Sequence, residues 1–299
     1  MSAPVFVVTP GTVEPAGSSA RKEPPAVPSP SGSRPGPGAG LVLTLLGSGD
    51  ELVLTGTEAR HAVTVRRLRE PERVDLVDGS GLRLVCTVTS AGDGARDRLG
   101  VRVLERVVEP APLVRLVLVQ ALAKGGRDEQ AVETATEVGA ETVLPWQARR
   151  CVSVWQGARR SRGRQRWQTT AREAAKQARR AVVPQVEEVR STGELAQWAR
   201  ATTQAGGVVA LLHEEARAPL SALAGPGQDG RPVLAVIVGP EGGIEREEVA
   251  VLEEAGAMTV RLGPHVMRTA SAGPVALAVL AQRAGLWEPA GAPGTEVAG

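Results

Sequence analysis

The second half of the chain alternates apolar runs with segments of helical period. Val114–Leu122 is a continuous apolar run, which is typical of a strand buried on both faces of a sheet. The other predicted strands are Thr142–Trp146, Val208–His213, Val233–Val238 and Thr259–Leu262. Apolar residues at helical spacing predict helices at Asp128–Val138, Gln165–Arg180, Ser191–Ala201, Glu245–Glu254 and Ser271–Gly285. This alternation indicates an α/β domain with a mostly parallel sheet.

Residues 40–108 follow a different pattern, in which short β-branched runs are separated by turn signals. The predicted strands are Leu41–Leu46, Glu51–Thr55, Arg73–Val77, Leu82–Thr89 and Val101–Val107. One helix is predicted among them, from Thr57 to Arg69, and it carries several arginines. The pattern indicates a small β-barrel with one helix, a kind of module that often holds RNA. A solvated helix face is the alternative explanation of the arginines.

The beginning of the chain combines a strand signal with a segment of low complexity. Pro4–Val8 is a short apolar run that holds the only Phe, whereas residues 9–39 contain eight Pro, five Gly and five Ser. Such a composition cannot bury enough surface to offset the entropy of ordering the chain. The segment 9–39 is therefore expected to be a disordered insertion or linker. Composition alone favours the alternative, in which everything before residue 40 is a disordered tail.

Composition narrows the classes of function. The 299 residues, 42% of them apolar, are enough for two domains. Cys86 and Cys151 are too few and too far apart for a disulfide framework, and no Cys/His spacing suggests zinc, so no metal is expected. No window approaches 18 uncharged apolar residues, and the first residues lack the pattern of a signal peptide. A soluble, cytoplasmic protein without a membrane span is expected.

Two glycine-containing loops stand close together within Val236–Pro274. The first is the Gly-Pro-Glu-Gly-Gly loop Gly239–Gly243, and the second is Leu262–Thr269, after which Thr269 or Ser271 is expected to cap a helix. Loops at the carboxyl ends of parallel strands line the usual ligand cleft of such sheets. The sequence lacks the dinucleotide and P-loop motifs, so backbone groups and shape are expected to bind the ligand, as would suit the adenosine of S-adenosylmethionine. Two ordinary turns are the alternative.

A basic run follows the first strands of this domain. Between Arg149 and Arg180 there are eleven basic residues and one acid, Glu173. The run also contains Trp155 and Trp167. Such a local excess of charge favours a surface that binds the phosphates of nucleic acid, with aromatic side chains available for base stacking. A solvated helix with a flexible loop is the alternative.

Several segments, in the right order, carry a resemblance to a known family. They are His61–Leu68, Asp75–Gly79, Lys124, Thr136–Gly139, Arg172–Arg180 with Pro184, Gly239–Gly243 and Leu262–Thr269. Together they closely resemble the 16S ribosomal RNA uridine-N3 methyltransferases, a family of the SPOUT superfamily, over nearly the whole folded chain.

The resemblance implies a domain organisation. A PUA-like RNA-binding β-barrel is expected over residues 1–110, with 9–39 as an insertion, because family members begin with a short aromatic strand like Pro4–Val8. A SPOUT methyltransferase domain with a C-terminal trefoil knot is expected over 111–290, and a disordered tail over 291–299. The resemblance also implies a homodimer with its site at the subunit interface, no metal and no membrane, and 16S ribosomal RNA of the small subunit as the substrate.

The resemblance also assigns residues to roles. S-adenosylmethionine is expected to lie against Leu211, Leu212, His213, Gly239, Pro240, Glu241, Gly242, Gly243, Leu262, Gly263, Val266, Met267, Arg268 and Thr269. RNA is expected to contact His61, Arg66, Arg67, Arg69, Lys124, Arg149, Arg150, Arg172 and Arg179. The chain departs from the family at Ala270, where family members commonly have an acid.

Methylation of uridine N3 requires alignment of the cofactor and removal of the N3 proton. Arg268 is expected to stabilise the uridylate, with Arg180 or Lys176 as second candidates. No residue stands out as the general base: a lone His265 is more often structural, and Glu241 is expected to brace its loop. Two other functions fit the same features. One is a SPOUT methyltransferase acting on another nucleotide or on a ribose, and the other is a non-catalytic ribosome-assembly factor.

Overall fold

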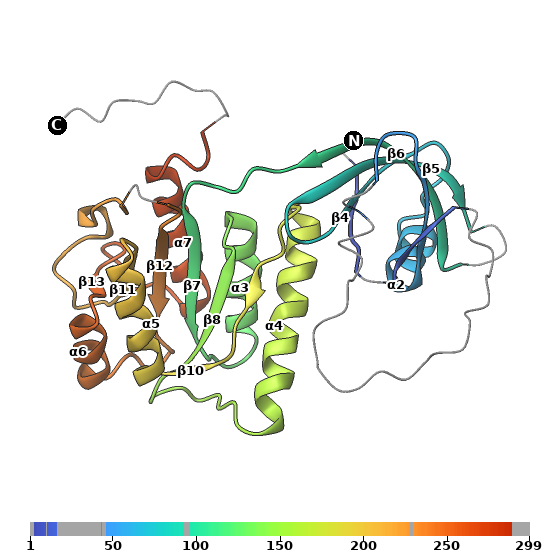
Figure 1. The fold of residues 1–299 in the computed structure, drawn as a ribbon. Coiled ribbons are helices and arrows are strands. Elements are labelled where there is room, and N and C mark those ends of the chain that lie inside the picture. Colours follow the sequence, from blue (N-terminus) through green and yellow to red (C-terminus); the bar gives the residue numbers. More distant parts are fainter. Residues whose placement is uncertain are drawn as a thin grey trace, which may run out of the picture. The chain divides into compact units, whose positions relative to one another are not determined.

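The computed structural model describes residues 3–9, 11–16, 43, 46–92, 96–227 and 230–288. The chain forms two compact units (Figure 1). One consists of Met1–Ala111 and Ala175–Val183, and the other of Pro112–Ala174 and Pro184–Gly299. The segment Ala175–Val183, which the sequence pattern assigns to the second domain, thus belongs with the first unit.

The first unit is built on a six-stranded sheet. Its strands are β1 (Val5–Val7), β2 (Val13–Pro15), β3 (Glu51–Thr55), β4 (Arg73–Val77), β5 (Leu82–Ala91) and β6 (Arg98–Val108), in the order β1-β4-β5-β6-β3-β2. The β1–β4 pair is parallel and the other pairs are antiparallel. A short helix α2 (Gly56–Arg60) continues as one π-helical turn, His61–Val65. The expected helix Thr57–Arg69 is therefore shorter and less regular.

The beginning of the chain packs into this sheet. The expectation that Pro4–Val8 pairs into the N-terminal module is confirmed: Val5 to Val7 pair with Asp75 to Val77, and Phe6 is buried in the core. The expectation of disorder throughout 9–39 is wrong at β2, because Val13 is buried and β2 pairs with β3. Residue 10, residues 17–39 and the expected C-terminal tail lie outside the described residues. The expected strand Leu41–Leu46 is wrong at Leu43, which is helical and buried.

Arg83 explains why Ala175–Val183 belongs to the first unit. Its guanidinium pairs with Asp75 at 2.8 Å and Glu109 at 2.6 Å, and it donates a hydrogen bond to the Arg179 carbonyl at 2.7 Å. The Gly81 N–H donates to the Ala181 carbonyl at 3.3 Å. These hydrogen bonds hold Ala175–Val183 against the first unit, although the two segments are far apart in the sequence.

The second unit holds a seven-stranded sheet. Its strands are β7 (Arg115–Ala121), β8 (Thr142–Gln147), β9 (Gln185–Val186), β10 (Arg190–Ser191), β11 (Val208–Leu212), β12 (Val233–Val238) and β13 (Met258–Val260). The order is β10-β8-β7-β12-β11-β13, with β9 beside β8, and every pairing is parallel. The five predicted strands are present, which confirms the α/β fold with a parallel sheet. The two-residue strands β9 and β10 were not predicted.

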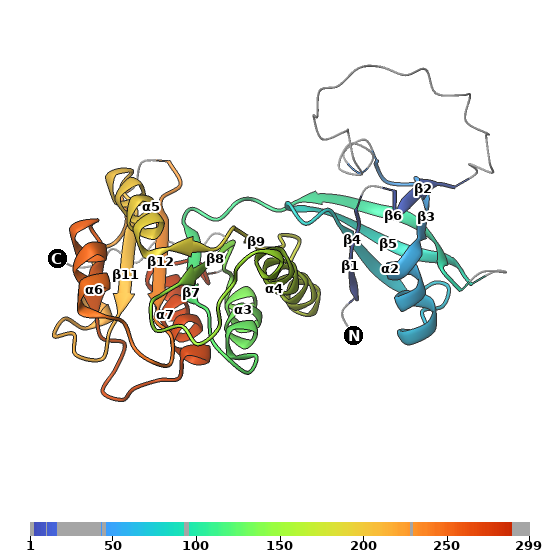
Figure 2. The same ribbon diagram turned by 90° about the horizontal axis from the view of Figure 1, so that it is seen from below.

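Helices cover both faces of this sheet (Figure 2). Leu116 and Leu118 of β7 pack toward α3 (Arg127–Val138), α4 (Ala158–Gln177) and α7 (Thr269–Arg283). Val117 and Val119 pack on the opposite face, toward α5 (Thr192–Gln204) and α6 (Arg246–Glu254). Because successive residues of a strand point to opposite faces, a strand covered on both sides reads as an unbroken apolar run.

Some details of the helices differ from expectation. The helix α4 begins at Ala158 and ends at Gln177, earlier at both ends than predicted. The capping box at Ser191 is present, with the Glu194 carboxylate accepting from the Ser191 N–H at 2.8 Å. A 3-10 turn spans Leu220–Ala222. The trefoil knot stays a prediction. No helix in the described part of the chain has the length and apolar character to cross a membrane.

Candidate functional site

A cavity of about 740 Å³ opens in the second unit at the carboxyl ends of β11, β12 and β13. Its wall consists of three segments, 212–215, 238–244 with Arg246, and 261–269 with Ala272, together with Arg127 and Arg150. The strands are parallel neighbours, so the loops that follow them meet at one edge of the sheet. Both glycine-containing loops predicted from the sequence therefore line the same cavity.

The residues expected to hold the cofactor gather here almost without exception. Leu212, His213, the whole Gly239–Gly243 loop and the predicted members of Leu262–Thr269 all line the cavity. Leu211 does not, because its side chain is buried in the core between the sheet and α5. Sequence reasoning missed Arg127, Glu214, Glu215, Arg246 and Arg261, which also line it. Glu214 and Glu215 could have been found, because they directly follow the predicted strand that ends at His213.

The glycines of the first loop are required by close packing. A Cβ atom on Gly239 would lie 2.5 Å from Ile244 Cγ1, and one on Gly242 would lie 3.1 Å from Arg150 Cβ. Gly243 has a φ of +77°, in the left-handed region that favours glycine. The missing Cβ atoms therefore let the loop, which lines the cavity, fold tightly against Ile244 and Arg150.

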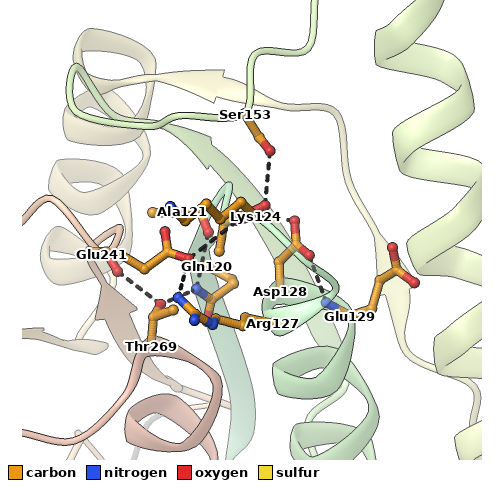
Figure 3. A network of polar contacts seen from close by, with 11 residues as sticks. Gln120, Ala121, Lys124, Arg127, Asp128, Glu129, Ser153, Glu241 and Thr269 are labelled. Atoms are coloured by element: carbon orange, nitrogen blue, oxygen red, sulfur yellow. Dashed lines mark hydrogen bonds and ion pairs between the residues drawn. The ribbon is translucent and has the colours of Figure 1, made fainter.

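Thr269 joins the two cavity loops through its hydroxyl group (Figure 3). The hydroxyl donates to the Gly239 carbonyl at 2.9 Å and accepts from the Gln120 side-chain amide at 2.9 Å. The expectation that Thr269 or Ser271 caps the last helix is wrong: the N-cap residue of α7 is Arg268, and no side chain caps it. The Thr269 hydroxyl instead forms hydrogen bonds with Gly239 and Gln120, so it does not cap α7.

Glu241 ties the first loop to the segment after β7. Its carboxylate accepts from the Arg127 guanidinium at 3.0 Å and from the Lys124 backbone N–H at 3.3 Å (Figure 3). Burial raises the pKa of Glu241, but the backbone N–H groups of Glu241 and Lys124 and the Arg127 charge outweigh it, so its pKa is lowered overall. Glu241 is therefore ionised at neutral pH and braces the loop.

Arg268 lies at the end of the second loop and lines the cavity. It is exposed, and among the described residues its guanidinium has no hydrogen-bond or ion-pair partner. Val266 and Met267, just before it, are exposed apolar residues. Ala270, at the position where the family commonly has an acid, is buried in the first turn of α7 and does not line the cavity.

In the basic run Arg149–Arg180, both tryptophans are buried and several arginines are paired with acids. Trp155 and Trp167 are buried against each other with ring centroids 5.0 Å apart, so the expectation that they stack on bases is wrong. Several of the charges are paired with acids from distant segments: Arg149 with Glu245 at 3.0 Å, Arg150 with Glu245 at 3.6 Å, Arg164 with Glu188 at 3.0 Å, and Arg166 with Glu129.

The predicted RNA-binding and catalytic residues divide between the units. Lys124, Arg149, Arg150 and Arg172 belong to the second unit, where Arg150 lines the cavity and donates to the Gly242 carbonyl at 3.3 Å. Lys176, Arg179 and Arg180 belong to the first unit. Lys176 is largely buried there and forms an ion pair with Glu58 at 3.1 Å. The structure thus provides a structural role for Lys176.

A second cavity, of about 450 Å³, lies in the first unit, and its polar lining residues are Arg67, Arg69, Glu70, Thr89 and Ser90. Val63, Leu68 and Ala91 complete its wall. Arg67 has a φ of 54°, which is unusual for a residue with a side chain. His61 packs its ring edge-on against Phe6, with centroids 6.1 Å apart, so it also contributes to the core.

Neither cysteine is suited to act as a nucleophile. Burial raises the pKa of the Cys86 thiol to about 12 and that of Cys151 to about 11. Both thiols are free and protonated at neutral pH, and a thiol in this form is a poor nucleophile. Among the described residues, no group of His, Cys, Asp and Glu side chains could hold a metal ion.

Each of the two units matches a known protein family. Residues 109–281 match the family model of an RNA methyltransferase domain, and residues 54–95 match that of an RNA methyltransferase PUA domain. The ribosomal RNA small subunit methyltransferase E of Mycobacterium bovis is 45% identical over 245 residues, covering 82% of this chain and 91% of that protein. The protein of the same name from Bacillus subtilis is 30% identical over 233 residues, covering 76% and 88%.

Solved structures show the same fold. The ribosomal RNA small subunit methyltransferase E from Neisseria gonorrhoeae, bound to S-adenosyl methionine, aligns with a TM-score of 0.71 at 22% identity, covering 96% of this chain and 98% of that one. A probable rRNA methyltransferase from Porphyromonas gingivalis aligns with a TM-score of 0.63 at 25% identity, covering 79% and 94%. With its PUA domain, methyltransferase domain and glycine-lined cavity, the chain belongs to the ribosomal RNA small subunit methyltransferase E family of RNA methyltransferases.

Proposed function

We propose that this protein transfers the methyl group of S-adenosylmethionine to N3 of a uridine in the 16S ribosomal RNA of the small subunit. The observation that carries the proposal is the cavity of about 740 Å³ formed by both glycine-containing loops, in a chain 45% identical to a small-subunit rRNA methyltransferase. The choice of uridine N3 rests on the resemblance of the loop sequences to that family.

The cavity fits a nucleoside-sized cofactor. Its volume lies in the usual range for small-molecule sites, and its wall includes three residues without a Cβ atom, Gly239, Gly242 and Gly243. Glu214 and Glu215 add carboxylates that can accept hydrogen bonds from hydroxyl or ammonium groups. S-adenosylmethionine carries both kinds of group and, when bound, would supply a methyl group activated on a sulfonium.

The residues of this chain would then align the reacting groups and stabilise charge. Loss of the N3 proton leaves a uridylate anion, and Arg268 is an exposed cation at the cavity that can stabilise it. Arg246 and Arg261 are also exposed and line the cavity, and the family resemblance singles out Arg268 among the three. Arg268 is therefore favoured over Lys176, whose charge is already balanced by Glu58, and over Arg180, which is not among the residues that line the cavity. We assign no general base: Glu241 is held by Arg127, and the exposed His265 side chain has no hydrogen-bond partner in the described part of the chain.

We also propose that RNA contacts basic residues of both units. In the first unit, Arg67 and Arg69 line one cavity together with Thr89, Ser90 and one acid, Glu70, so two cations and two hydroxyl-bearing residues are available there to a phosphate group. In the second unit, Arg150 lines the candidate cofactor cavity. Salt-dependent binding is expected, because each phosphate contact releases counterions.

A homodimer is part of the proposal. Val275 and Val279 lie one turn apart on α7 and are 38% and 39% exposed, on a helix whose opposite face is buried. Val266 and Met267 add exposed apolar surface from the cavity loop. Exposed apolar groups along one helix face and the adjoining loop favour a subunit interface close to the site.

Modification mapping of ribosomal RNA from a strain that lacks this protein tests the proposed reaction. The expected result is the loss of one N3-methyluridine from 16S RNA, restored by the purified protein with S-adenosylmethionine. Loss of a different modification would instead identify another target of the same fold. Calorimetry separates the non-catalytic alternative, because a well-folded assembly factor without catalytic function would not bind S-adenosylmethionine.

A further inference from the structure

Gln120 is the one polar residue in the buried part of β7, Leu116–Ala121. It is 0% exposed near the end of β7, between Val119 and Ala121, and it pairs in register with Val238, the last residue of β12. The first glycine-containing loop begins at the next residue, Gly239. An apolar side chain would satisfy the packing at this position, so the amide calls for a specific explanation.

The hydrogen bonds of the Gln120 amide fix its orientation. Its nitrogen donates to the Ala121 carbonyl at 3.0 Å and to the Thr269 hydroxyl at 2.9 Å (Figure 3). A carbonyl oxygen can only accept, so the group that faces Ala121 must be the NH₂ and not the oxygen. The remaining oxygen, Oε1, is buried and has no hydrogen-bond partner among the described residues.

This orientation also fixes the direction of the next hydrogen bond. The Thr269 hydroxyl has a single proton, and it accepts from Gln120 on one lone pair. Its own proton is then directed to the Gly239 carbonyl, 2.9 Å away. A chain of donors thus runs from the end of β7, through the first residue of α7, to the first residue of the loop after β12.

The helix α7 comes close enough for this chain because of Gly273. A Cβ atom at Gly273 would lie 2.6 Å from Leu118 Cδ1 and 3.0 Å from Val238 Cγ2. The absence of that Cβ lets the first turns of α7 approach β7 and β12 closely. Backbone packing therefore places Thr269 where both of its partners can reach it.

We propose that Gln120 is a positioning residue for cofactor binding. It holds the Thr269 hydroxyl in one orientation, and through it the Gly239 carbonyl, so that the two loops lining the cavity keep a fixed spacing and the loop backbone is preorganised. Gln120 is not among the residues that line the cavity. The inference rests on the proposed function for the identity of the ligand, S-adenosylmethionine.

The test measures the dissociation constant of S-adenosylmethionine by calorimetry on the full chain, together with its unfolding in urea. Gln120→Leu removes both donors at similar volume, and Gln120→Met is a second apolar variant in case the first does not fold. Thr269→Val removes the hydroxyl that accepts from Gln120 and donates to Gly239, whereas Thr269→Ser keeps it. Val119→Ala is the matched control, because Val119 is a buried β7 residue that packs on the opposite face of the sheet.

Gln120→Leu is expected to raise the dissociation constant by about five- to tenfold, the usual effect of one lost hydrogen bond. Its kcat at saturating cofactor is expected to stay within about threefold, and Thr269→Ser to bind nearly normally. Val119→Ala is expected to unfold at lower urea yet bind within about twofold of the wild type. The double variant Gln120→Leu, Thr269→Val is expected to bind no more weakly than Thr269→Val alone, since both break the same chain.

Two results would overturn the inference: folded Gln120 variants with an unchanged dissociation constant, or independent, multiplying effects in the double variant. A wild-type protein that does not bind S-adenosylmethionine at all would instead refute the proposed function. The two failures are therefore distinguishable.

Discussion

Individual side chains connect loops that are far apart in the sequence. Glu241 reaches the segment after β7, Thr269 reaches the Gly239 carbonyl, and Arg150 donates to the Gly242 carbonyl. Each contact is made to the backbone of a loop, so each one constrains where the N–H and C=O groups of the cavity wall can point. Arg268 differs from them because its charge stays available to a ligand.

Replacement of Arg268 by alanine separates catalysis from binding. Because Arg268 is expected to stabilise the uridylate, Arg268→Ala should lower kcat by about 10²-fold, as the loss of one such charge does in other enzymes. The dissociation constant of S-adenosylmethionine, measured by calorimetry, should change little. Normal turnover with unchanged cofactor binding would remove Arg268 from the mechanism.

Replacement of Glu241 by glutamine should reveal a dependence of stability on pH. The pKa of Glu241 is lowered in the folded chain from its ordinary value of 4.5. The ionised carboxylate therefore stabilises the folded state at pH values above 4.5. This stabilisation is lost as the pH falls through the pKa that Glu241 has in the folded chain. Glu241→Gln should therefore be less stable than the wild type at pH 7 by on the order of 1 kcal/mol. Urea unfolding at pH 7 and pH 3 checks this, and an equal difference at both values would contradict it.

The helix α4 contributes to the hydrophobic core of the second unit, which its basic sequence does not predict. Its sequence is strongly basic, yet Trp167 on α4 and Trp155 just before it are buried against the second unit's core. Gly163 allows this packing: a Cβ there would lie 2.4 Å from the Trp155 ring. The glycine, which a helix normally disfavours, is needed for the contact between the helix and the preceding loop.

Two glycine-to-alanine changes in helices should therefore have opposite effects. Gly163→Ala should destabilise the protein by about 1 to 3 kcal/mol, because the new methyl group overlaps the Trp155 ring. Gly193→Ala in α5, where nothing lies within 4 Å of the new Cβ, should stabilise it by about 0.5 to 1 kcal/mol through helix propensity. Urea unfolding measures both. Equal effects of the same sign would show that the Trp155 contact does not decide the outcome at Gly163.

For the whole molecule, each of the two units brings one component of the proposed function. The first unit combines a six-stranded sheet with a cavity that contains two arginines, and the second combines a parallel sheet with the glycine-lined cavity. Exposed apolar residues on α7 favour self-association of the second unit.

A charge placed on that helix should prevent dimer formation. Val279→Asp should convert a dimer into a monomer in light scattering coupled to gel filtration, because burying a lone carboxylate is costly. Methyl transfer should fall with it if the site is shared between subunits. Val251→Asp on α6, at a similar exposure of 40%, is the control and should remain dimeric. A monomeric wild type would refute the proposed homodimer.

Much of the fold follows from local pattern. The five predicted strands of the second unit, its helices and the two cavity loops are all present, because alternation of apolar runs and glycine-rich turns depends on neighbouring residues. The loop residues at the site were predictable for the same reason, together with the family motifs. Pairings between distant segments were not, and these include β2 with β3 and Lys176 with Glu58.

The linear pattern of residues was sufficient for the α/β fold, for a strand-rich N-terminal module and for a cavity at Gly239–Gly243 and Leu262–Thr269. Only the folded chain could show that Trp155 and Trp167 are buried, that several of the arginines are paired, and that Gln120 of β7 donates a hydrogen bond to Thr269. The physical reason is distance along the chain. Secondary structure depends on residues a few positions apart, whereas burial, ion pairing and hydrogen bonding depend on partners that only folding brings together.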